Sequence, residues 1–79
     1  MTNYEKGRRF EYRVRDLFRE CGFIVIRAAQ SKPIDLVCLK DGWSILVECK
    51  TKKTSLSKEG KRELMEIAKT SKALPVLAY

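Results

Sequence analysis

The sequence predicts one α/β domain whose elements follow the order αβββαβ. Its 79 residues are too few for two domains, so 1–79 is treated as a single unit. Two stretches, 2–21 and 57–72, carry apolar residues at helical spacing. The remaining apolar runs are short and rich in β-branched residues, which is typical of strands. Asp41-Gly42 divides the longest run, and such a pair is a strong signal for a two-residue hairpin turn.

The first helix is predicted over 2–21. Thr2 and Glu5 have the spacing of a capping box, in which two side chains bind backbone N–H groups at the start of a helix. Gly22 is suited to the position just after the helix, which favours a left-handed conformation. One apolar stripe is expected along this helix, formed by Phe10, Val14, Leu17, Phe18 and Cys21.

Three strands are predicted next, over 23–29, 34–40 and 43–51. The first reads FIVIRAA and is followed by a loop that ends at Pro33, a residue that resists helix formation. The second and third flank the Asp41-Gly42 turn, so they should pair as an antiparallel hairpin.

A basic connector, TKKTSLSKEG, leads into the second helix. Ser57 is a suitable N-cap, and the helix is predicted to run to about Lys72. The last segment, PVLAY at 75–79, is predicted to be a short strand. The residues expected on or beside the buried side of the second helix are Leu64, Met65, Ala68 and Ile67.

The charge balance indicates a polyanionic partner. Lysine and arginine number 17 against 10 acids, which gives a formal net charge of +7. Such a chain favours DNA or RNA first and an anionic membrane surface second. The sequence has no run of roughly 18 apolar residues and no apolar signal-peptide core at its start, so no membrane insertion is expected.

The cysteine pattern argues against a disulfide framework or a zinc site. Cys21, Cys38 and Cys49 form no CxxC pair. We expect them to act as small apolar side chains in a reducing, cytoplasmic environment. The 79 residues contain no histidine, which excludes imidazole ligands and histidine-based triads among them.

The predicted hairpin brings two carboxylates together. If Asp41 and Gly42 are the turn residues, the numbers of paired residues sum to 83, so Asp35 faces Glu48 with Cβ atoms about 5 Å apart. Lys50 follows Glu48 by two positions and points to the same face. Opposed carboxylates repel each other, so either one pKa rises or a cation lies between them.

Oxygen ligands without histidine or a thiolate pair suit a hard ion such as Mg²⁺. Lys50 would then orient a metal-bound water or stabilise charge on a scissile phosphate. The two acids, the metal and the lysine would together form the site of a metal-dependent phosphodiesterase. The alternative is a solvated face on which Lys50 forms an ordinary surface ion pair. A β-bulge would also shift the pairing of Asp35 with Glu48.

The residues P-I-D at 33–35, a spacer of twelve residues and E-C-K at 48–50 resemble the PD-(D/E)XK nuclease motif. KGRRFEYRV, GFIVIRAAQS, VECKTKK and PVLAY resemble the archaeal Holliday junction resolvases, and the similarity covers nearly the whole chain. The resemblance implies a restriction-endonuclease-like core, in which helices flank a mixed sheet. Family members generally continue beyond the segment that matches PVLAY with further strand and tail residues.

The resemblance also implies roles for the acids and the lysine. Asp35 and Glu48 match the metal-binding acids, and Lys50 matches the catalytic lysine. Glu11 matches a helix glutamate that contributes to the metal site and to catalysis, and the carbonyl of Cys49 would be the backbone ligand. The implied cofactor is Mg²⁺, with Mn²⁺ also accepted.

Further positions are implied to serve catalysis or DNA binding. Ser31 matches a loop serine linked to catalysis, although an ordinary turn serine explains it equally well. The family commonly has arginine directly after the helix glutamate, whereas this chain has Tyr12 there. Basic residues expected to contact DNA phosphates are Arg8, Arg9, Arg13, Arg27, Lys52 and Lys53.

The expected function is that of a Mg²⁺-dependent endonuclease that cuts branched DNA, four-way junctions above all, as a homodimer. Two alternatives stay open. One is a nicking or restriction-like nuclease that acts on other DNA. The other is a non-catalytic basic module whose acids never bind metal.

Overall fold

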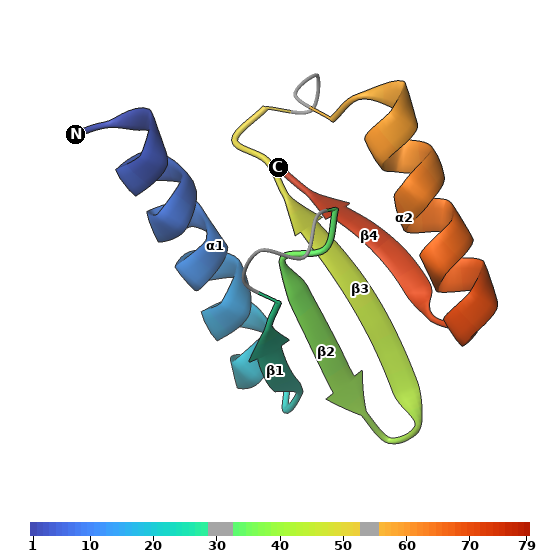
Figure 1. Ribbon diagram of the computed structural model, residues 1–79. Coiled ribbons are helices and arrows are strands. Elements are labelled where there is room, and N and C mark those ends of the chain that lie inside the picture. Colours follow the sequence, from blue (N-terminus) through green and yellow to red (C-terminus); the bar gives the residue numbers. More distant parts are fainter. Residues whose placement is uncertain (29–32, 53–55) are drawn as a thin grey trace.

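The computed structural model describes residues 1–28, 33–52 and 56–79. Within them the predicted order αβββαβ is confirmed. Figure 1 shows a sheet with one helix beside its first strand and the other beside its last. The elements are α1 (Asn3–Glu20), β1 (Ile24–Arg27), β2 (Leu36–Lys40), β3 (Trp43–Cys49), α2 (Lys58–Ser71) and β4 (Leu74–Ala78).

The start of α1 is fixed by the predicted capping box. The hydroxyl of Thr2 accepts a 3.1 Å hydrogen bond from the backbone N–H of Glu5, and the Glu5 carboxylate accepts a 3.2 Å bond from the backbone N–H of Thr2. Two N–H groups that the helix leaves unpaired are therefore satisfied.

The end of α1 is closed by a Schellman motif around Gly22. Gly22 has φ +90°, and its N–H donates to the carbonyl of Arg19 at 2.9 Å. The N–H of Phe23 donates to the carbonyl of Phe18 at 3.1 Å, and the two phenyl rings meet edge to face at 5.3 Å. This closure sets the direction in which the chain enters β1.

The four strands form one mixed sheet in the order β1-β2-β3-β4. β1 pairs with β2 and β2 with β3 in antiparallel fashion, whereas β3 and β4 are parallel. Asp41 and Gly42 both have positive φ, 48° and 82°, as a tight hairpin turn requires. The predicted register, with numbers summing to 83, is confirmed from Lys40–Trp43 to Leu36–Val47.

The two helices cover opposite faces of the sheet. Alternate strand residues point to opposite faces, and Leu36, Cys38 and Val47 pack against Val14 of α1, whereas Leu46 packs against α2. The buried residues of α2 are Leu64 and Ala68, which lie one turn apart. The core therefore has two parts, one on each side of the sheet.

Four residues expected on or beside a buried helix side are exposed instead. Leu17 is 61% exposed and Cys21 is also exposed, because only Phe10, Val14 and Phe18, spaced by four residues, pack on the sheet. Met65 is 51% exposed and Ile67 39%, because the row of Leu64 and Ala68 alone faces β3. No helix in the described part of the chain is long and apolar enough to cross a membrane.

Candidate metal and DNA site

Asp35, which directly precedes β2, and Glu48 of β3 lie at the end of the hairpin remote from its turn. The ladder between β2 and β3 ends at the Leu36–Val47 pair, one pair before the predicted pairing of Asp35 with Glu48. Asp35 instead donates its backbone N–H to the carbonyl of Val47 at 2.8 Å. Its Oδ2 accepts a 2.7 Å hydrogen bond from the backbone N–H of Cys49. The Asp35 carboxylate thus accepts the hydrogen bond from the Cys49 N–H that a backbone carbonyl of a neighbouring strand would otherwise accept.

Glu48 is a buried carboxyl group with another carboxylate beside it. Only 4% of the residue is exposed. Burial and then the neighbouring Asp35 carboxylate raise the pKa of Glu48 to about 8. The positive charge of Lys50 acts in the opposite direction and lowers this pKa, so Lys50 lies close enough to influence the acid.

Lys50 directly follows β3 and is held by its backbone. Its N–H donates to the carbonyl of Ala78 at 2.9 Å, which extends the contact between the third and fourth strands. Lys50 is half-buried. Asp35, Glu48 and Lys50 therefore gather where β2 begins and β3 ends, as the hairpin register predicts.

Cys49 lies between the acids. Burial first, and then the charges of Asp35, Glu11 and Glu48, raise the pKa of its thiol to about 12. A thiol that stays protonated is a poor metal ligand, which leaves the backbone carbonyl as the atom that this residue would contribute.

Glu11, on α1, is near this group but engaged elsewhere. Its Oε1 accepts a 2.7 Å hydrogen bond from Nε of Arg27, and its side chain is 18% exposed. Among the residues that the structure describes, no group of three or more His, Cys, Asp and Glu side chains is arranged to hold a metal ion. The structure thus brings together two acids and leaves Glu11 paired with Arg27.

The two acids fit a hard divalent cation. A cation between them would offset both the repulsion and the desolvation that raise the pKa of Glu48. Mg²⁺ keeps several waters and is commonly held by one or two carboxylates, so two protein carboxylates are sufficient.

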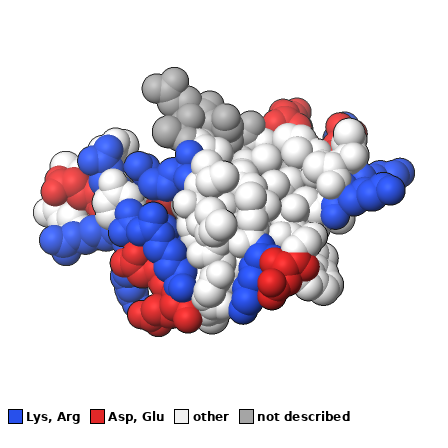
Figure 2. Space-filling view, turned by 90° about the horizontal axis from the view of Figure 1, so that it is seen from below, with Lys and Arg blue, Asp and Glu red and all other residues white. Residues whose placement is uncertain are grey.

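Five of the seven arginines lie on α1. Figure 2 views the molecule from below relative to Figure 1. On the face seen there, Lys and Arg gather on the α1 side, interleaved with acids, while the middle of the face is largely uncharged. Arg8 stacks on Tyr4 at 4.9 Å from the ring centroid, and Arg27 stacks on Tyr12 at 5.0 Å. The remaining predicted DNA contacts that the structure describes are exposed, namely Arg9, Arg13 and Lys52.

Two predicted residues, Ser31 and Lys53, lie outside the described residues. The sequence predicts no site role for Tyr12, yet the guanidinium of Arg15 lies 4.5 Å from its ring centroid. Their spacing of three residues on a helix is the signal that could have identified this contact.

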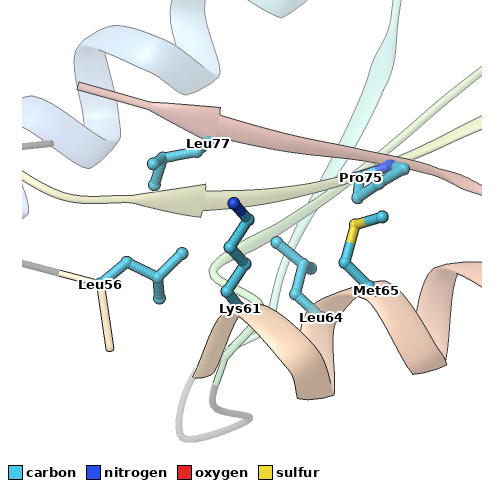
Figure 3. Close-up of a pocket in the computed structure, with 6 residues that line it drawn as sticks. All are labelled: Leu56, Lys61, Leu64, Met65, Pro75 and Leu77. Atoms are coloured by element: carbon cyan, nitrogen blue, oxygen red, sulfur yellow. The ribbon is translucent and has the colours of Figure 1, made fainter. Parts of the chain in front are cut away.

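An apolar hollow of about 320 Å³ lies between α2 and β4 (Figure 3). Among the described residues that line it, Lys61 is the one charged side chain and none is an acid, so they offer a metal ion no carboxylate. These residues are Leu56, Lys61, Leu64, Met65, Pro75 and Leu77.

A mixed sheet with helices on both faces, and P-I-D and E-C-K segments that meet at one end of a hairpin, define the class of PD-(D/E)XK nuclease cores. The family model described as archaeal Holliday junction resolvase (Hjc) matches residues 2–79, and the chain belongs to this family. The crossover junction endodeoxyribonuclease Hjc of Methanocaldococcus jannaschii is 36% identical over 78 residues. That match covers 95% of this chain and 59% of the relative, so the chain spans well under two thirds of the relative's length.

Proposed function

We propose that this chain is a Mg²⁺-dependent endonuclease that cleaves branched DNA, with four-way junctions as its main substrate. The observation that carries the proposal is the meeting of Asp35, Glu48 and Lys50 at one end of the β2–β3 hairpin. The family match and the name of the methanogen relative support the choice of DNA junctions as the substrate.

Asp35 and Glu48 would hold the metal with their carboxylates, and the Cys49 carbonyl and Glu11 are the further ligands proposed. Bound Mg²⁺ would supply an activated water and stabilise charge on the scissile phosphate, as such ions do in nucleases. The Cys49 N–H fixes one oxygen of Asp35 through its 2.7 Å hydrogen bond, which orients the acid. Lys50 would orient the attacking water and balance negative charge beside Glu48.

Basic residues of α1 and of the segment after β3 would bind phosphates on either side of the cut. This contribution is independent of sequence and weakens with salt. A homodimer is proposed as the active form, because symmetric cuts in two strands need two sites and a two-fold dimer is the commonest way to present them.

The test is a cleavage assay on a labelled four-way junction and on a linear duplex built from the same arms, with Mg²⁺ and with EDTA. Glu48→Gln removes the charge with little change in shape. Glu63→Gln is the matched control, because it makes the same change at an exposed position of α2. The parent protein and the Glu63→Gln control should cleave the junction with Mg²⁺ but not with EDTA, and should leave the linear duplex intact. Glu48→Gln should cleave neither DNA.

Equal cleavage of both DNAs would support the proposed metal site and contradict the proposed preference for junctions, since the substrate would then be DNA in general. Binding without cleavage of either DNA would favour the non-catalytic basic module. Sedimentation of the protein with a junction tests the dimer, since only monomer on DNA would contradict it.

A further inference from the structure

The ring of Tyr12 contacts two arginines that come from different parts of the fold. Arg15 lies one turn further along α1, and its guanidinium carbon is 4.5 Å from the ring centroid. Arg27 is the last residue of β1, and its guanidinium carbon is 5.0 Å from the same centroid. Both distances are within the range of about 6 Å over which a cation is attracted to an aromatic face.

Each of these arginines is also fixed through its Nε atom. Nε of Arg27 donates to Glu11 at 2.7 Å, and Nε of Arg15 donates to Asp16 at 3.0 Å. Within the described part of the chain, neither arginine makes a hydrogen bond through its Nη groups. Toward the described residues, the terminal donors, which form the fork that binds phosphate oxygens, are therefore open on both side chains.

The location of Arg27 connects this pair to the acids. The N–H of Ala28, the next residue, donates to the backbone carbonyl of Asp35 at 2.8 Å. The end of β1 thus lies directly beside the residue that begins the acidic group. A phosphate bound by Arg27 would be close to the phosphate that is cut.

We propose that Arg15 and Arg27 form a binding site for a phosphate of the DNA backbone, and that Tyr12 is the positioning residue for both guanidinium groups. The ring of Tyr12 attracts both guanidinium groups, and the carboxylates of Glu11 and Asp16 balance their charge. Because the side chains are ordered before DNA arrives, binding loses less conformational entropy. This inference rests on the proposed function for the identity of its ligand, and it requires no cleavage.

The test measures binding of a fluorescent linear duplex in EDTA, by anisotropy, over a series of KCl concentrations. The double variant Arg15→Gln/Arg27→Gln should reduce the magnitude of the slope of log K against log salt by about 0.9, since the two arginines share one phosphate contact. Tyr12→Leu should weaken binding about 2- to 5-fold, and Tyr12→Phe, which keeps the ring, should bind like the parent protein.

The decisive comparison places Tyr12→Leu in the Arg15→Gln/Arg27→Gln background. A residue that acts only through the two arginines loses its effect there. Tyr4→Leu is the matched control, because the ring of Tyr4 faces Arg8 instead and its effect should be the same in both backgrounds. Thermal melts verify that every variant is folded, and the salt slope of the arginine double variant tests the site without any change at Tyr12.

Two results would overturn the proposal. One is an unchanged salt slope in the double variant, and the other is an equal loss of affinity from Tyr12→Leu in both backgrounds. The failure of the proposed nuclease would look different, since it would leave these binding results intact and abolish only cleavage with Mg²⁺.

Discussion

The backbone N–H of Cys49 donates a 2.7 Å hydrogen bond to Oδ2 of Asp35 and so ties the start of β2 to the end of β3. One carboxylate thereby serves two purposes. It completes the hydrogen bonding of the hairpin where the regular ladder has ended, and it is held beside Glu48. The stability of the hairpin end and the electrostatics of the site are therefore linked.

This link predicts opposite results for two substitutions of Asp35. Asp35→Ala leaves the Cys49 N–H without its acceptor and should lower the free energy of unfolding by about 1–3 kcal/mol. Asp35→Asn keeps an oxygen acceptor and removes the charge beside Glu48, so its free energy of unfolding should equal or exceed that of the parent protein. Urea unfolding in EDTA measures both. Equal destabilisation by the two variants would show that the hydrogen bond contributes little.

The raised pKa of Glu48 predicts how stability depends on pH without metal. The folded protein keeps a proton on Glu48 up to about pH 8, whereas the unfolded chain loses it near the ordinary value of 4.5. Between these values the folded state binds more protons, so the free energy of unfolding should fall as pH rises. Glu48→Gln should remove this fall, and Asp35→Asn should reduce it in part, because burial is the larger cause.

Urea titrations in EDTA at several pH values between 4.5 and 8 measure the effect. Stability that rose across this range in the parent protein relative to Glu48→Gln would contradict the assignment. Adding Mg²⁺ should stabilise the parent protein more at the upper end of the range, since the metal needs the ionised acid.

Local signals were sufficient to predict much of the fold. The capping box at Thr2 and the Asp41-Gly42 turn depend on residues a few positions apart, and both are as predicted. The hairpin register followed from the turn alone and placed Asp35 near Glu48. These features need no knowledge of how the helices pack on the sheet.

Features that depend on packing could not be read in the same way. Met65 and Leu17 are apolar and correctly spaced, yet each helix presents only one narrow row to the sheet, so both are exposed. The contact of Tyr12 with Arg27 joins a helix to a strand and requires the crossing geometry of the two elements. The burial that raises the pKa of Glu48 likewise arises only in the folded chain.

Two glycines predict opposite responses to alanine. Gly22 has φ +90°, a conformation that costs an L-residue about 1–2 kcal/mol, and an added Cβ would lie 3.3 Å from Nζ of Lys40. Gly22→Ala should therefore destabilise the protein by at least that amount. Gly7 lies inside α1 with nothing within 4 Å of an added Cβ, so Gly7→Ala should stabilise it by about 0.5–1 kcal/mol. Thermal unfolding of the pair measures both, and equal shifts would exclude the Schellman closure at Gly22.

The last prediction concerns the share of Glu11 in metal binding. Arg27 already occupies Oε1 of Glu11, which leaves the second carboxylate oxygen for a metal ion. Glu11→Gln should therefore reduce the rise in melting temperature that Mg²⁺ produces by less than Glu48→Gln does. Arg27→Gln releases the Glu11 carboxylate and should preserve or increase that rise.

Differential scanning fluorimetry with a Mg²⁺ series, repeated with Ca²⁺, measures these shifts without any DNA. Glu5→Gln is the matched control on the same helix, because its carboxylate serves the capping box at the far end of α1. If Glu11→Gln keeps the full Mg²⁺ response, Glu11 is no metal ligand, and its role is to hold Arg27 through their 2.7 Å contact. If it loses as much as Glu48→Gln, Glu11 contributes to metal binding as strongly as Glu48 does.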